Sequence, residues 1–242
     1  MAKSRMKPVA IFDVDGTIFR SSLIVELIEA LIVAGIFPKD VKRHYADAWK
    51  RWQARSGNSK TGFAYYEFIN GVVFAYRKHL TGIRRADVWR VAERVVEFHK
   101  MRLYRYTRDL VKKLKKTHYL LAISHSPYEV VAPFARSLGF DKVYAMVYEV
   151  DREVRFTGRV LYEDIIRKKD KVVRRAARKG DFTMAGSVGV GDTESDIPFL
   201  RIVDRPIAFN PSMKLYKHAL KRGWEVVVER KNVIYQMKSV KL

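Results

Sequence analysis

The sequence predicts an α/β fold with a doubly wound, mostly parallel sheet and an inserted helical segment. Three apolar runs each end on a small or charged polar residue: Val9–Asp13, Tyr119–Ser124 and Gly186–Asp192. Strands buried in a parallel sheet read as continuous apolar runs, and open α/β sheets bind ligands beyond the carboxyl ends of their strands. We therefore expect these three strand ends to converge on one site.

Helical patterns separate the apolar runs, as the alternation of strands and helices in a parallel sheet requires. Thr107–Lys116 precedes the second run and Pro127–Leu138 follows it, while Lys171–Lys179 precedes the third. The segment Val147–Val160 has a charged turn near Asp151 and indicates a hairpin or a pair of loops.

Residues 21–99 do not follow this alternation of strands and helices, because they hold several helix-like segments and no convincing strand. Their breaks fall at Pro38, Gly57, Gly62, Gly71 and Gly82. This pattern predicts a helical cap of residues 21–99, inserted directly after the first strand and loop. The core would then consist of residues 1–20 and 100–242. Within the cap, Tyr45, Trp49 and Trp52 recur at helical spacing, which favours packing between helices over the lining of a substrate pocket.

Composition excludes several classes of protein. With no cysteine among 242 residues, disulfides and thiolate metal sites are excluded, and any metal must be held by carboxylates, histidines or carbonyl oxygens. The longest apolar stretch, Leu23–Phe37, contains Glu26 and Glu29 and is shorter than the roughly 20 apolar residues that a membrane span needs. Since Met1–Pro8 lacks a separate apolar stretch, a cytoplasmic protein is expected.

The chain is strongly basic, with 48 Lys and Arg against 26 Asp and Glu and a formal net charge of +22. Such a charge attracts polyanions and anionic membrane surfaces, so a basic protein that binds nucleic acid or an anionic surface is one hypothesis. The basic residues are spread over several helix-like segments, however. A solvated helix face explains them more simply than a dedicated binding patch.

The run Asp13-Val14-Asp15-Gly16-Thr17 carries the clearest chemistry. Two carboxylates two positions apart at a strand end can approach one point, and Gly16 allows the loop to turn tightly. One carboxylate can attack a phosphorus atom to form an aspartyl-phosphate, and the other can donate a proton to the leaving oxygen.

Further residues fit the same chemistry at the other strand ends. Asp192 and Asp196 offer more carboxylates, which with the first pair would hold Mg²⁺, a cation that prefers oxygen ligands. Ser124 can donate a hydroxyl hydrogen bond and Lys171 can offset phosphoryl charge. Lys168 and Lys169 stand close to Lys171, which we favour because it directly precedes the apolar pair Val172-Val173.

Four motifs in this order resemble those of haloacid-dehalogenase-type phosphatases, in particular the phosphoserine-phosphatase-like group. The matching segments are FDVDGT at 12–17, ISHSP at 123–127, KDKVVRRA at 169–176 and VGDTESDIPFL at 190–200. The resemblance covers residues 8 to about 228, whereas the cap is similar only in position and helical character. It implies a Rossmann-like core with a helical cap.

The resemblance also implies roles for single residues. Asp13 would be the nucleophile and a metal ligand, and Asp15 the general acid and base that offers its backbone carbonyl to the metal. Asp192 would be the second metal carboxylate, supported by Asp196. Thr17 and Ser124 would bind phosphoryl oxygens or brace the loop, and Lys171 would stabilise the phosphoryl group.

Three positions depart from the pattern of phosphoserine phosphatases, which have a serine, a cap glutamate and a glycine where this chain has Gly16, Ser22 and His125. We therefore expect an enzyme that hydrolyses a small phosphomonoester other than phosphoserine. A phosphotransferase that uses the same residues is the alternative. The side chain of His125 could equally touch the substrate or pack locally.

Overall fold

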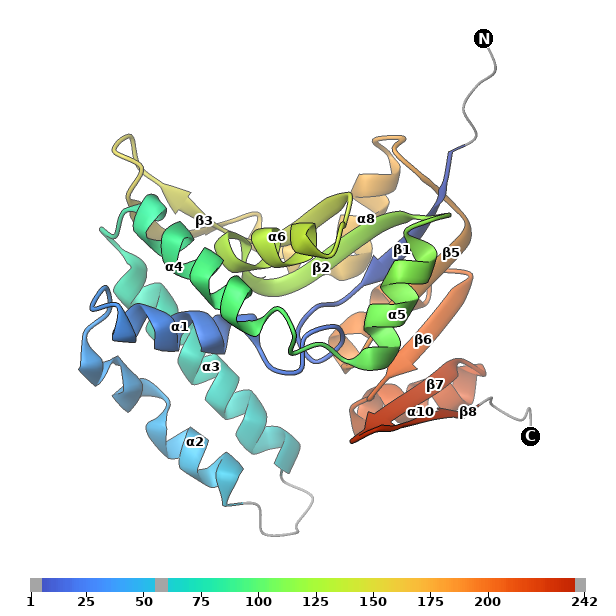
Figure 1. Ribbon diagram of the computed structural model, residues 1–242, viewed down its shortest axis with the longest axis horizontal. Helices are drawn as coiled ribbons and strands as arrows, with labels where there is room; N and C mark the ends of the chain where they lie inside the picture. The colour runs from blue at the N-terminus through green and yellow to red at the C-terminus, as the bar shows by residue number, and fades with distance from the viewer. Residues whose placement is uncertain (1–5, 55–60, 238–242) are drawn as a thin grey trace.

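The computed structural model describes residues 6–54 and 61–237, and its centre is an eight-stranded sheet (Figure 1). The strand order is β4-β3-β2-β1-β5-β6-β7-β8. The strands are β1 (Pro8–Phe12), β2 (Tyr119–Pro127), β3 (Lys142–Val150), β4 (Phe156–Leu161), β5 (Thr183–Gly191), β6 (Arg205–Phe209), β7 (Glu225–Arg230) and β8 (Val233–Met237). All neighbours pair in parallel except the two edge pairs, β3 with β4 and β7 with β8.

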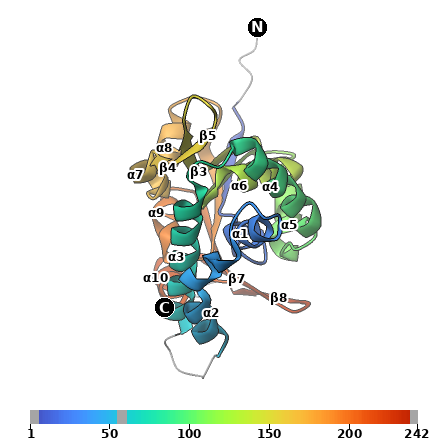
Figure 2. The ribbon, with the colours of Figure 1, turned by 90° about the vertical axis from the view of Figure 1, so that its left-hand side faces the viewer.

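The predicted doubly wound fold is confirmed by the helices on both sides of the sheet. Helices α5 (Arg105–Leu114) and α6 (Tyr128–Ser137) cover one face. Helices α8 (Lys169–Ala177), α9 (Ile197–Leu200) and α10 (Met213–Arg222) lie on the other side (Figure 2). None of the helices in the described ranges is long and apolar enough to cross a membrane.

The three predicted apolar runs are the central strands β2, β1 and β5, which lie next to one another. Phe12 pairs with Ala122 on one side and with Val190 on the other, and it is fully buried. Because the three strands are parallel and in this register, the residues that follow them emerge together at one edge of the sheet.

Residues 21–99 contain helices and no strand of the sheet within their described part. They form α1 (Leu23–Val33), the 3-10 helix η1 (Lys39–His44), α2 (Ala46–Gln53), α3 (Thr61–Leu80) and α4 (Arg85–His99), which we call the helical insertion. Helix α4 packs against α6 of the core and against α1, while α3 runs past β4. Figure 1 shows the insertion at one end of the molecule and α10, β7 and β8 at the other.

The aromatic residues of the insertion pack on one another, as predicted. The Trp52 ring stacks on Phe68 at 5.6 Å between centroids, and Trp49 lies 5.1 Å from Phe68. Tyr45 is buried and its hydroxyl donates a hydrogen bond to Glu29. The predicted hairpin is present as well, since Val147 of β3 pairs with Leu161 of β4 in antiparallel register.

Candidate active site

The loop after β1 places Asp13 and Asp15 at the edge of the sheet. The Asp13 amide donates to the carbonyl of Val190, which ties the loop to β5. Gly16 has φ +79°, and a Cβ atom at this position would lie 2.2 Å from Oδ2 of Asp192. Only glycine therefore allows both the left-handed turn and the close approach of Asp192.

A buried lysine joins two of the predicted carboxylates. Lys169 Nζ lies 2.5 Å from Oδ1 of Asp13 and 2.6 Å from Oδ1 of Asp196, and its side chain is 2% exposed. Burial lowers the pKa of Lys169, but the two carboxylates outweigh it and raise this pKa above its usual value. Lys169 is therefore a fixed positive charge beside the Asp13 carboxylate.

The prediction of Lys171 at this place is wrong, because Lys171 is exposed and lies outside the site. Helix α8 begins at Lys169, and its buried residues are Lys169, Val172, Val173 and Ala176. This i, i+3, i+4, i+7 spacing puts Lys169 on the face that meets the core and Lys171 on the opposite face. The same spacing is readable in the sequence and would have selected Lys169.

Asp15 has a different set of partners. Its Oδ1 accepts the backbone amide of Leu23 at 2.5 Å, and its Oδ2 accepts the hydroxyls of Ser124 and Ser126, each at 2.8 Å. Burial raises the pKa of Asp15 above its usual value, although the three hydrogen-bond donors lower it. Ser126 was not predicted, although its two-residue spacing from Ser124 on an extended strand puts both on one side.

The fully buried Thr17 connects two of the carboxylates. Its hydroxyl lies 3.1 Å from Oδ2 of Asp13 and 3.3 Å from Oδ1 of Asp192. Asp196 braces the loop after β5. Its Oδ2 accepts the backbone amides of Asp192 and Thr193, each at 3.0 Å. The structure thus brings all the predicted residues together except Lys171.

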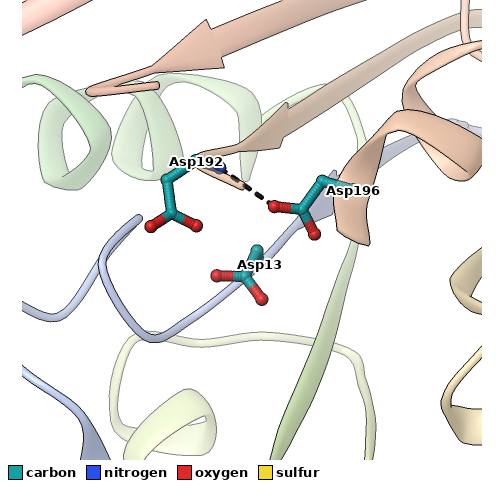
Figure 3. A group of neighbouring side chains, drawn as sticks. All are labelled: Asp13, Asp192 and Asp196. Carbon is teal, nitrogen blue, oxygen red and sulfur yellow. Dashed lines mark hydrogen bonds between the residues drawn. The ribbon is translucent and has the colours of Figure 1, made fainter. Parts of the chain in front are cut away.

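Figure 3 shows that Asp13, Asp192 and Asp196 point toward one space. One carboxylate oxygen of each lies within 4.8 Å of the others. Burial raises the pKa of Asp13 to about 7 and that of Asp192 well above its usual value. The charge of Asp196 raises both pKa values further, and the charge of Asp13 also raises that of Asp192. A set of buried oxygen ligands that resists full ionisation fits a hard divalent cation such as Mg²⁺.

The three carboxylates differ in how they could hold such a cation. Asp196 accepts hydrogen bonds from Lys169 and from the two backbone amides, more than either of the other two carboxylates accepts among the described residues, so it suits a supporting role. Asp13 and Asp192 receive fewer hydrogen bonds in the described part of the chain and suit direct ligation.

A cavity of about 450 Å³ opens onto these residues. Its lining includes Asp13, Asp15 and Lys169 from the core and Tyr65 and Arg77 from helix α3 of the insertion. His125 also lines it, with Nε2 3.2 Å from the carbonyl oxygen of Ile166. Burial and the nearby charge of Lys169 lower the pKa of His125 to about 4, so its ring is neutral near neutral pH.

Comparison with known proteins finds a family and several relatives. Residues 10–201 match the family of haloacid dehalogenase-like hydrolases. The chain is 25% identical over 235 residues to a histidinol-phosphatase of Neisseria meningitidis, covering 92% of this chain and 99% of that protein. It is 28% identical over 223 residues to a phosphoserine phosphatase of Mycobacterium tuberculosis, covering 90% of this chain and 69% of that protein.

Solved structures share the fold. A protein of unknown function from Bordetella pertussis superposes with a TM-score of 0.70 at 22% identity, over 91% of this chain and 98% of that one. A phosphoserine phosphatase solved as an analogue of its phospho-aspartyl intermediate gives a TM-score of 0.59 at 18% identity, over 94% and 95%. At these identities the likeness concerns the fold alone.

Proposed function

The chain belongs to the haloacid dehalogenase-like hydrolase family, and we propose that it is a magnesium-dependent phosphatase that cleaves small phosphomonoesters through an aspartyl-phosphate at Asp13. One observation carries this proposal. Two carboxylates two residues apart share one cavity, Asp13 paired with a buried lysine and Asp15 held by neutral donors. Two acids in different environments are what nucleophilic and general-acid roles require.

Asp13 is the nucleophile in this proposal. Its carboxylate attacks phosphorus, so a P–O bond forms to Asp13 as the bond between phosphorus and the ester oxygen breaks. Lys169, 2.5 Å from Oδ1 of Asp13, favours the ionised form of this carboxylate, and it lies in the same cavity, where it offsets the charge of the phosphoryl oxygens.

Asp15 is the general acid and base. Burial raises the pKa of its side chain, which favours the protonated form that can donate to the departing ester oxygen. The resulting carboxylate then takes a proton from the water that attacks the aspartyl-phosphate. Ser124 and Ser126 hold Oδ2 of Asp15 in place through both steps.

We assign Mg²⁺ to Asp13, Asp192 and the backbone carbonyl of Asp15, with Asp196 in support. When bound, the ion would neutralise the carboxylates and the substrate phosphate together. The partners of Thr17 and Ser124 favour bracing of the carboxylates over direct contact with phosphoryl oxygens.

The helical insertion acts as the cap in this proposal, because its helix α3 contributes Tyr65, Tyr66, Asn70 and Arg77 to the cavity wall. Specificity would then depend on α3. The relatives act on phosphoserine and histidinol phosphate by name, and both esters belong in a substrate panel. Gly16, Ser22 and His125 stand against phosphoserine.

The test is release of inorganic phosphate from a phosphomonoester panel by the purified protein, with Mg²⁺ and with chelator. We expect turnover with Mg²⁺, none with chelator, and none from Asp13→Asn. Adding glycerol as an acceptor separates hydrolysis from transfer, because a phosphotransferase would form glycerol phosphate. Turnover by Asp13→Asn at the wild-type rate would overturn the proposal.

A further inference from the structure

Three charged side chains other than Lys169 and the aspartates form a cluster in the wall of the active-site cavity. Arg77 of α3 and Arg167, which follows α7 (Glu163–Ile166), both donate to the same oxygen of Glu163. The Arg77 Nη1 distance is 3.4 Å, and the Arg167 Nε and Nη2 distances are 3.0 and 2.7 Å. All three line the cavity that contains Asp13.

The cluster joins the helical insertion to the core and carries an excess of positive charge. Arg77 belongs to the insertion, whereas Glu163 and Arg167 belong to the core. Two guanidinium groups face one carboxylate, and the other cation of the cavity wall, Lys169, is already bound to Asp13 and Asp196. The cavity wall therefore holds two further cations that the proposed catalytic residues do not use.

The ion pair between Arg77 and Glu163 is open to exchange. The side chains of Arg77 and Glu163 are 37% and 31% exposed, and their single contact is long. Exposed ion pairs contribute about 0–1 kcal/mol, so an incoming anion can replace the Glu163 carboxylate at Arg77 at little cost. The pair with Arg167 is closer and makes two contacts, but the Arg167 side chain is 57% exposed and its guanidinium can also reach an incoming anion. Arginine binds carboxylate and phosphate oxygens through paired N–H groups, which suits either anion here.

Apolar side chains occupy other parts of the same wall, among them Ile69 and Val73 of α3 and Met146 and Val160 of the hairpin. The cavity volume of about 450 Å³ also lies in the range of sites that take ligands of drug size. Such a cavity accommodates a substrate that has an apolar part beside its charged groups.

We propose that the substrate is a phosphomonoester with a second anionic group, which binds between Arg77 and Arg167 in place of the Glu163 carboxylate. This inference rests on the proposed function, because the phosphoryl end is placed at Asp13. Glu163 occupies the anion position when the cavity is empty. Substrate binding would then link the helical insertion to the core through its own second anion.

Alkyl phosphates of increasing chain length test the inference, with a methyl, carboxylate, phosphate or ammonium group at the far end. At the chain length that spans the cavity, we expect kcat/KM for a carboxylate or phosphate end to exceed that for methyl about 10- to 100-fold. The carboxylate and phosphate series show which anion is preferred. Equal rates, or preference for ammonium, would overturn the inference while the proposed function stands. A panel with no turnover would overturn the proposed function itself.

Variants connect the preference to the cluster. Arg77→Met and Arg167→Met should each reduce the anion-to-methyl ratio of kcat/KM toward one, whereas Arg94→Met, at an exposed arginine of α4 outside the cavity, should keep it. Glu163→Gln should raise the ratio, because the competing carboxylate is removed. This readout holds even if an arginine variant folds poorly. An unchanged ratio in Arg77→Met, or a lower ratio in Glu163→Gln, would contradict the assignment.

Discussion

The Asp15 carboxylate accepts the backbone amide of Leu23 at 2.5 Å, and Leu23 is the first residue of helix α1. Ser22, at the N-cap position, makes no side-chain capping bond, so the acid candidate itself satisfies a free amide of this helix. The positive end of the helix dipole lies at the same place and favours the ionised carboxylate. The proposed proton donor is thus also the structural connection between the catalytic loop and the helical insertion.

Substitutions at Asp15 should separate these two roles. An asparagine oxygen can still accept the Leu23 amide, so Asp15→Asn should keep its Tm, whereas Asp15→Ala should lose about 1 kcal/mol of stability. Both should lose the proton donor. We expect kcat for an alkyl phosphate to fall about 10²- to 10⁴-fold and kcat for p-nitrophenyl phosphate to fall less, because p-nitrophenolate leaves without a proton. Equal losses on both esters would argue against general-acid catalysis by Asp15.

The two lysines of α8 provide a matched pair of variants. Lys169 contacts Asp13 and Asp196, while Lys171 is exposed on the other side of the helix. Lys169→Met should lower kcat for phosphomonoesters at least about 10²-fold, since it removes the cation beside the proposed nucleophile Asp13. Lys171→Met should stay within about twofold of wild type, as surface substitutions generally do. Steady-state kinetics on both variants decides, and a larger loss from Lys171→Met would contradict the geometry.

The sequence predicted the architecture and most of the site because both depend on local patterns. Apolar runs ending on Asp13, Ser124 and Asp192 identify parallel strands, and parallel strands bring their ends together. The prediction chose Lys171 because it directly precedes the apolar pair Val172-Val173. The helical period instead places Lys169 on the same face as that pair. The partners Arg77 and Glu163 lie 86 residues apart on separate helices, and no local pattern relates them.

Gly16 should tolerate no side chain, because its φ is positive and because a Cβ atom would meet the Asp192 carboxylate. A second glycine, Gly82, separates these two effects. Gly82 has φ +80°, like the +79° of Gly16, but a Cβ at Gly82 would meet nothing within 4 Å. Gly82→Ala therefore carries only the backbone cost, about 1–3 kcal/mol. Gly16→Ala should lose more stability and nearly all phosphatase activity, because its Cβ would displace the Asp192 carboxylate. Urea unfolding compares the two, and equal losses with activity retained would show that Asp192 adjusts freely.

Stability without metal should depend on pH through Asp13. Its pKa is about 7 in the folded chain against 3.8 as the usual value, so the folded state binds this proton more tightly than the unfolded state does. This contribution is complete below about pH 4 and is lost as the pH rises through about 7. His125 has a pKa of about 4 in the folded chain against 6.5 as the usual value. Its contribution to stability therefore increases as the pH rises from about 4 to about 6.5, opposite to that of Asp13.

Thermal melts of wild type and Asp13→Asn in chelator report the pH dependence that Asp13 contributes, including its effect on the pKa of Asp192, because both proteins retain His125. The Tm of wild type relative to that of the variant should fall between about pH 4 and about pH 7. Mg²⁺ should raise the wild-type Tm more at about pH 8 than at about pH 5, since it competes with protons for the carboxylates. Asp13→Asn should respond less to Mg²⁺ at both values, because it lacks one ligand. A Tm difference that is constant with pH, or an Mg²⁺ effect that is larger at the lower pH, would contradict the assignment of Asp13 as both titrating group and metal ligand.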